Sequence, residues 1–155
     1  MFAGMKNSMQ HVAERLAVCL MLAMLFAVGC GKAPSAVPDA SLTHMKVLGK
    51  LYGKCMSRQR GAYPRDETAF IAFLEQAPEN WNKLAPSAKG FLSSPRNGEP
   101  LTVLYGAKVK EPVEGGFPWI AYETSSIYGA RLIVNAQGTV ELVDDQEFSQ
   151  RVPQS

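Results

Sequence analysis

The sequence predicts an α+β domain in which an N-terminal amphipathic helix and a short second helix pack on an antiparallel sheet of about four strands. Two observations carry this prediction. Apolar residues recur at helical spacing after residue 41, and short β-branched or aromatic runs separated by turn residues fill the region after residue 100. Helices followed by consecutive hairpin-linked strands favour a sheet covered by the first helix.

The first predicted helix begins at Ser41, whose hydroxyl suits an N-cap, and continues to about Gln59. At about 100° per residue its apolar residues fall on one half of the helix. They are Leu42, Met45, Leu48, Leu51, Tyr52, Cys55 and Met56. The Gly-Ala-Tyr-Pro sequence at 61–64 ends the helix, because Gly accepts unusual backbone angles and Pro disfavours helix in the residue before it.

A second, shorter helix is predicted after Asp66, which can cap it, and Pro78 ends it. Residues 79–100 have no clear period and are predicted to be a long connection, in which residues 94–98 form a turn. The side chains expected to pin this connection to the core are Trp81, Leu84, Phe91 and Leu92.

Four short strands are predicted at residues 101–105, 119–123, 130–135 and 139–143. Residues 110–118 form a Pro/Gly loop between strands. Residues 135–138 fit a hairpin turn in which Gly138 takes the left-handed angle. A final helical turn at about residues 145–151 closes the domain, with Asp144 or Asp145 as its cap.

The first 29 residues are typical of a secretory signal, with Lys6 and Arg15 before an apolar run at residues 16–28. The run is shorter than the roughly 20 residues that span a bilayer. The Leu-Phe-Ala-Val-Gly-Cys sequence at 25–30 resembles the lipobox of bacterial lipoproteins. This resemblance implies cleavage before Cys30, a diacylglyceryl thioether on its sulfur and usually an N-acyl group, and more than one acyl chain makes anchoring stable. The alternative is an ordinary secretory signal with a chance cysteine.

Cleavage at this site divides the chain into a signal peptide at 1–29, a lipidated cysteine and flexible tether at 30–40, and a single globular domain at 41–155. The tether is rich in Pro, Ser and small residues, and fully extended it would reach roughly 30 Å. The anchor predicts a location in a bacterial cell envelope, facing the periplasm or the exterior, with the membrane as a partner through the lipid on Cys30.

The net charge of the cleaved chain does not indicate a class of partner. Cleavage removes two of the 16 basic and one of the 14 acidic residues, so fourteen basic and thirteen acidic residues remain. Cys55 is then the only thiol besides Cys30, so no internal disulfide is predicted. Two roles stay open for Cys55: a buried apolar residue, or a disulfide with another chain.

Four short motifs resemble planctomycete-type proteins related to type II secretion pseudopilins. They are the 61–64 sequence, Ser-Pro-Arg-Asn-Gly-Glu-Pro at 94–100, Ala-Tyr-Glu at 121–123 and Gln-Gly-Thr-Val at 137–140. The resemblance covers roughly residues 42–148 and implies a pseudopilin-like fold. The cleavage motif and the assembly helix of pseudopilins are missing, and a lipobox stands in their place. The resemblance therefore implies a related fold without filament assembly, and the calcium loop of that family is not reproduced around Glu111 and Glu114.

No catalytic residue, metal site or cofactor is predicted. The chain has two histidines, and cleavage removes His11 and leaves His44, so Ser-His-Asp and multi-His metal sites cannot form from it. We interpret His44 as structural. The one carboxylate pair that could serve a glycosidase is Glu123 with Glu141 on neighbouring strands. We interpret both as solvated, with Glu123 in a cross-strand pair with Arg131 as a further option.

The opposite face of the first helix carries a basic stripe made of Lys46, Lys50, Lys54 and Arg58. It is either an ordinary solvated face or a surface for an anionic membrane or a partner protein. Nucleic acid is not expected for a secreted chain without a flanking aromatic platform. The sequence predicts a non-catalytic, lipid-anchored interaction or assembly module that binds another envelope protein. A periplasmic enzyme acting on cell-wall glycan and a small-ligand binder are the alternatives.

Overall fold

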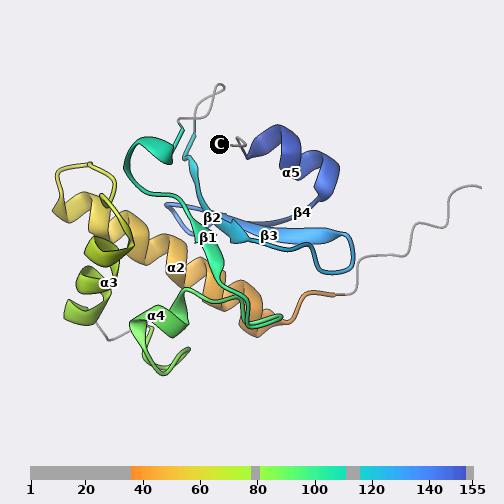
Figure 1. The fold of residues 1–155 in the computed structure, drawn as a ribbon, viewed down its shortest axis with the longest axis horizontal. Helices are drawn as coiled ribbons and strands as arrows, with labels where there is room; N and C mark the ends of the chain where they lie inside the picture. Colours follow the sequence, from red (N-terminus) through yellow and green to blue (C-terminus); the bar gives the residue numbers. More distant parts are fainter. Residues whose placement is uncertain (1–35, 78–80, 111–115, 153–155) are drawn as a thin grey trace, which may run out of the picture. The chain divides into compact units, whose positions relative to one another are not determined.

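A computed structural model describes residues 36–77, 81–110 and 116–152 of the chain (Figure 1). All of them belong to one unit, Pro34–Ser155. The architecture is α+β as predicted: a long first helix and short helices packed on a four-stranded antiparallel sheet. The signal peptide, Cys30, most of the tether and Pro78 lie outside the described residues.

Helix α2 (Asp39–Arg58) begins earlier than predicted. Pro38 occupies the N-cap position, and its carbonyl oxygen accepts the backbone N–H of Ser41 at 2.9 Å. Ser41 is therefore inside the first turn and buried, so its prediction as the N-cap was wrong. Asp39 and Ala40, predicted as tether, are helical. The fixed φ of Pro38 and the negative charge of Asp39 both favour a start at this point.

Helix α2 ends where the sequence predicts. The N–H of Gly61 donates to the carbonyl oxygen of Met56 at 2.9 Å, and Gly61 has a φ of 90°. Helix α3 (Glu67–Gln76) follows with the predicted cap: Asp66 Oδ1 accepts the N–H of Ala69 at 2.9 Å. That hydrogen bond, together with Arg65, lowers the pKa of the Asp66 carboxyl.

The predicted long connection contains a short helix that the sequence did not indicate, α4 (Ala88–Phe91), capped by Ser87. Its role is to place Phe91 in the core, where the ring is fully buried. Trp81 and Leu92 are buried as predicted, and Leu84 packs at the edge of the core. The turn at residues 94–98 is confirmed, since the N–H of Gly98 donates to the Ser94 carbonyl at 2.8 Å.

The sheet has the order β1-β2-β3-β4, and each strand runs antiparallel to the next. Strands β2 (Trp119–Glu123) and β3 (Ala130–Asn135) have the predicted bounds. Strand β1 (Leu101–Val103) is shorter than predicted, because the chain turns into the 3-10 helix η1 (Gly106–Lys108), and β4 (Val140–Asp144) starts one residue later.

The two faces of the sheet are covered by different helices, with α2 on one side and α5 (Asp145–Arg151) on the other (Figure 1). Leu132 and Val134 of β3 point into the large core shared with α2, α3 and α4. Ile133, between them, belongs to a small cluster with Val143 and Phe148 beneath α5. Asp144 caps α5 as predicted, accepting the N–H of Glu147 at 2.7 Å. The sheet is therefore the middle of three layers.

Candidate binding surface on helix α2

The predicted basic stripe is exposed along α2, but its members are not equivalent. Lys46, Lys50 and Lys54 have no carboxylate within ion-pair distance among the described residues. Arg58 is different, because its guanidinium lies 5.2 Å from the centre of the Phe73 ring. This cation–π contact ties Arg58 to α3. The three lysines of the stripe are therefore cations without an ion pair in the described part of the chain.

Beside the stripe, the β3–β4 hairpin rests directly on two glycines of α2. A Cβ atom added at Gly49 would lie 2.3 Å from the backbone oxygen of Asn135, and one at Gly53 would lie 2.2 Å from that of Ala136. Both distances are far below contact distance, so only Gly permits this approach. The signal of this approach in the sequence is a pair of glycines four residues apart within a helix.

The hairpin itself is held by Asn135. Its side-chain Oδ1 accepts the backbone N–H groups of Gln137 and Thr139, each at 3.0 Å, while Gly138 has the predicted left-handed angle with a φ of 84°. This arrangement fixes Ala136 and Gln137 above α2. The hairpin turn predicted from the sequence is confirmed, and its function is to present these two residues next to the helix.

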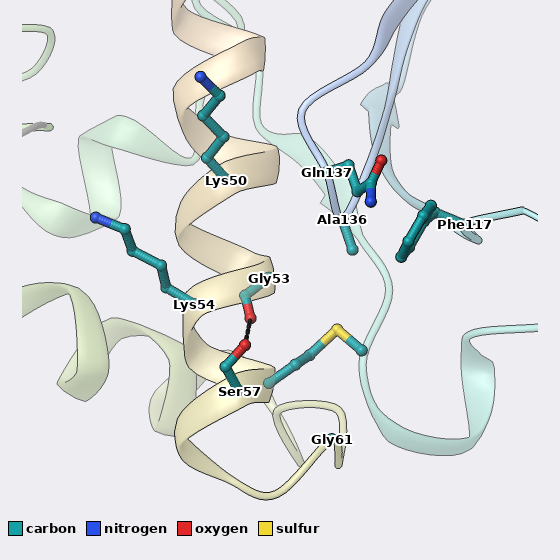
Figure 2. Close-up of a pocket in the computed structure, with 9 residues that line it drawn as sticks. Lys50, Gly53, Lys54, Ser57, Gly61, Phe117, Ala136 and Gln137 are labelled. Atoms are coloured by element: carbon teal, nitrogen blue, oxygen red, sulfur yellow. Dashed lines mark hydrogen bonds between the residues drawn. The ribbon is translucent and has the colours of Figure 1, made fainter.

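An open hollow of about 630 Å³ lies where α2 meets the hairpin (Figure 2). Its lining comes from three separate parts of the chain and is mostly apolar. The lining residues are Lys50, Gly53, Lys54, Met56, Ser57, Gly61, Phe117, Ala136 and Gln137. Phe117 is 49% exposed. In Figure 2 the ammonium groups of Lys50 and Lys54 point away from Phe117.

The carboxylate pair considered for a glycosidase is not assembled. Glu141 stands in register with Ile133, which stands in register with Tyr122, so Glu141 shares the α5 face with those residues. Glu123 follows Tyr122 in β2 and therefore points to the other face. Glu141 pairs with Arg151 of α5. Two carboxylates on opposite faces of a sheet cannot flank one glycosidic bond.

Glu123 is 1% exposed, so its interpretation as a solvated residue was wrong. Its carboxylate accepts hydrogen bonds from Arg96 Nη1 at 2.7 Å, from Ser94 Oγ at 2.7 Å and from the Leu132 N–H at 2.9 Å. Arg96 reaches it because the turn at 94–98 folds over the end of β2. A buried carboxylate with three donors is structural, since its charge is matched and its oxygens are occupied.

The option of a Glu123–Arg131 pair is also wrong. Arg131 lies on the α5 face of β3, where its Nε is 3.0 Å from Asp145 Oδ1 and its guanidinium is 4.6 Å from the centre of the Phe148 ring. Neighbouring residues of a strand point to opposite faces, and this alternation separates Arg131 from Glu123. Arg131 instead fastens α5 to the sheet.

His44 and Cys55 are both core residues. His44 Nε2 lies 2.8 Å from the carbonyl oxygen of Phe91, and the two rings are 4.6 Å apart. Burial lowers the pKa of His44 below its ordinary value of 6.5. The Cys55 thiol is fully buried, and burial raises its pKa. The structural interpretation of His44 is confirmed, and burial removes Cys55 from reach of a disulfide with another chain.

Within the described part of the chain, no group of three or more His, Cys, Asp or Glu side chains lies close enough to hold a metal ion. No helix among the described residues is long and apolar enough to cross a membrane. Comparison of the chain with protein-family models, with curated proteins and with solved structures gave no match. The fold and the surface define an α+β domain whose first helix presents an apolar hollow and lysines that have no ion pair among the described residues.

Proposed function

We propose that the chain is a lipid-anchored protein of a bacterial cell envelope, whose folded domain binds a partner and catalyses no reaction. The observation that carries the binding role is a contrast between two sets of side chains. The groups with reactive potential, Glu123, His44 and Cys55, are buried and occupied within the fold. The groups that have no ion-pair partner among the described residues, Lys46, Lys50 and Lys54, are exposed on α2, where Lys50 and Lys54 line an apolar hollow.

The proposed anchor is supported by the order of charge, apolar run and Leu-Phe-Ala-Val-Gly-Cys at the start of the sequence. Cys30 is eight residues before Pro38, so a short segment separates the proposed lipid from α2. A partner in the same envelope would meet the domain close to the membrane surface. The proposed partner is therefore another envelope protein, with the bilayer itself serving as the attachment site.

We also propose that the fold is pseudopilin-like. A long N-terminal helix laid across one face of an antiparallel meander supports this proposal. In this protein the helix starts at Asp39, and the sequence before it offers a lipobox in place of an assembly helix. This arrangement favours a tethered domain that binds its partner singly over a subunit that polymerises.

Metabolic labelling with a fatty-acid analogue tests the anchor. The wild-type protein is expected to incorporate the label and to fractionate with membranes, while Cys30→Ser is expected to lose the label and appear in the soluble envelope fraction. Cys19→Ser is the matched control, because Cys19 lies in the predicted signal peptide and should not affect labelling. Equal labelling of the wild type and Cys30→Ser would overturn the proposed anchor.

A further inference from the structure

We infer that the hollow beside Phe117 docks an acidic segment of a partner protein, which places one apolar side chain in the hollow and its carboxylates on Lys50 and Lys54. This inference rests on the proposed binding function and adds the chemistry of the partner. It is carried by three observations: the shape of the hollow, the exposed ring at its wall, and the position of the unpaired lysines.

The shape of the hollow follows from the contact between α2 and the hairpin. Gly53 has no side chain, and Ala136 has only a methyl group, so the surface between the helix and the hairpin is depressed. Met56 adds a flexible thioether to the lining, which can adapt to different apolar side chains. The result is an open hollow between the helix and the hairpin (Figure 2).

The exposed ring of Phe117 indicates that the hollow is incomplete without an occupant. Among the described residues, the large hydrophobic side chains that are exposed are Phe117 and Tyr128. Tyr128 is not part of the hollow's lining, whereas Phe117 is. An apolar side chain placed against Phe117 and Met56 would remove both from water, and aromatic anchors in such pockets dominate many protein interfaces.

The lysines determine the charge of the occupant. Lys50 and Lys54 belong to the lining, and their ammonium groups point away from Phe117 (Figure 2). A polypeptide segment that crosses α2 near Gly53 lies against Phe117 and extends to the two ammonium groups, and its carboxylates would supply the partners that the lysines lack within the described structure.

The same geometry favours a protein over a lipid surface. Unpaired lysines on a membrane-anchored chain are attracted to anionic headgroups. A bilayer surface is flat, however, and cannot enter a depression between α2 and the hairpin. A bilayer would satisfy the lysines and leave the hollow empty. A peptide segment can pair with the lysines and also fill the hollow.

The test is selection of random short peptides displayed on phage against the full-length protein in mild detergent. The inference expects enriched peptides to carry an aromatic or aliphatic residue near Asp or Glu. Their affinity is expected to fall about tenfold for the Lys50→Glu, Lys54→Glu double variant, the effect of roughly 1.4 kcal/mol on binding. A similar loss is expected for Phe117→Ser. Lys108→Glu, a charge reversal outside the lining, should bind as the wild type does.

Each other outcome has a definite meaning. Enriched peptides that bind all variants equally would overturn the docking site and leave the proposed binding function standing at another surface. No enrichment, combined with salt-dependent binding to phosphatidylglycerol vesicles that Lys50→Glu, Lys54→Glu abolishes, would replace the peptide by the membrane. Self-association lost in Phe117→Ser would replace it by a second copy of the chain. Thermal melting of each variant verifies that the fold is intact. None of these outcomes bears on the lipid anchor, which the Cys30→Ser labelling tests separately.

Discussion

Arg96 Nη1 lies 2.7 Å from Glu123 Oε2, and their side chains are 7% and 1% exposed. The pair joins the turn at 94–98 to the end of β2. Arg96 Nη2 also donates to the Ile127 carbonyl at 3.3 Å, so the same side chain holds the loop between β2 and β3. One buried ion pair therefore connects the turn at 94–98 to the end of β2 and to the loop that follows it.

Arg96→Ala is expected to destabilise the fold by about 3–5 kcal/mol, because it leaves the Glu123 carboxylate buried without its cation. Urea denaturation of the detergent-solubilised protein measures the loss. Adding Glu123→Gln to Arg96→Ala should recover part of the stability, since the amide is neutral and its oxygen can still accept from Leu132. Additive losses in the double variant would contradict a charge-matched pair.

This pair also illustrates what the sequence could not predict. Strands β2 and β3 were predicted to the residue, because their apolar runs are bounded by turn residues on both sides. Glu123 looked like an exposed strand residue, since the partner that permits its burial is 27 positions earlier in the chain. The hollow was missed for a similar reason. Its lining becomes visible only once the hairpin is known to rest on Gly53.

The first residue of α2 could not be predicted from the sequence for a local reason. Ser41 has the chemistry of an N-cap, yet the helix starts at Asp39, because Pro38 already supplies an extended residue whose carbonyl begins the helix. Helix α4 was missed because four residues are too few to produce a period. Long helices with a clear apolar period and strands with turn residues at both ends were predictable. The choice between two neighbouring N-cap residues and the presence of a single helical turn were not.

Gly49→Ala and Gly53→Ala are expected to destabilise the fold by about 1–3 kcal/mol each, because a methyl group at either position collides with the hairpin backbone. This sign is opposite to the usual effect of Gly→Ala within a helix. Chemical denaturation measures it. Thr43→Ala, at an exposed position of the same helix, should leave stability unchanged or slightly increase it. A gain of stability for Gly53→Ala would contradict the close approach.

Two tyrosines with buried hydroxyl groups give a matched pair of predictions. The Tyr52 hydroxyl donates to the Leu104 carbonyl at 2.7 Å, whereas the Tyr105 hydroxyl is buried with no hydrogen-bond partner among the described residues. Tyr52→Phe should therefore lower stability by about 1–3 kcal/mol, and Tyr105→Phe should raise it by about 1 kcal/mol. Thermal melts of the two variants decide the point, and losses of equal size would show that both hydroxyls are satisfied.

His44 predicts a mild acid sensitivity. Burial lowers the pKa of His44 in the fold, while the unfolded chain has the ordinary value of 6.5. Below pH 6.5 His44 is therefore protonated in the unfolded chain but not in the folded protein. The free energy of unfolding decreases as the pH is lowered, until the pH reaches the pKa of His44 in the fold. The difference in unfolding free energy between the wild type and His44→Gln should shrink over this range. A difference that stays constant between about pH 7 and pH 5 would show that protonation of His44 does not affect stability.

The most direct test of the account is site-specific photo-crosslinking in intact cells, with a photoreactive residue in place of Gln137 or Gln146. Gln137 lines the hollow, and Gln146 is exposed on α5, which covers the other face of the sheet. We predict that position 137 crosslinks to an acidic segment of one identified envelope protein, that position 146 does not, and that the Lys50→Glu, Lys54→Glu substitutions remove the adduct. Crosslinks from position 137 to lipid alone, or equal protein adducts from both positions, would contradict a partner-binding surface on α2.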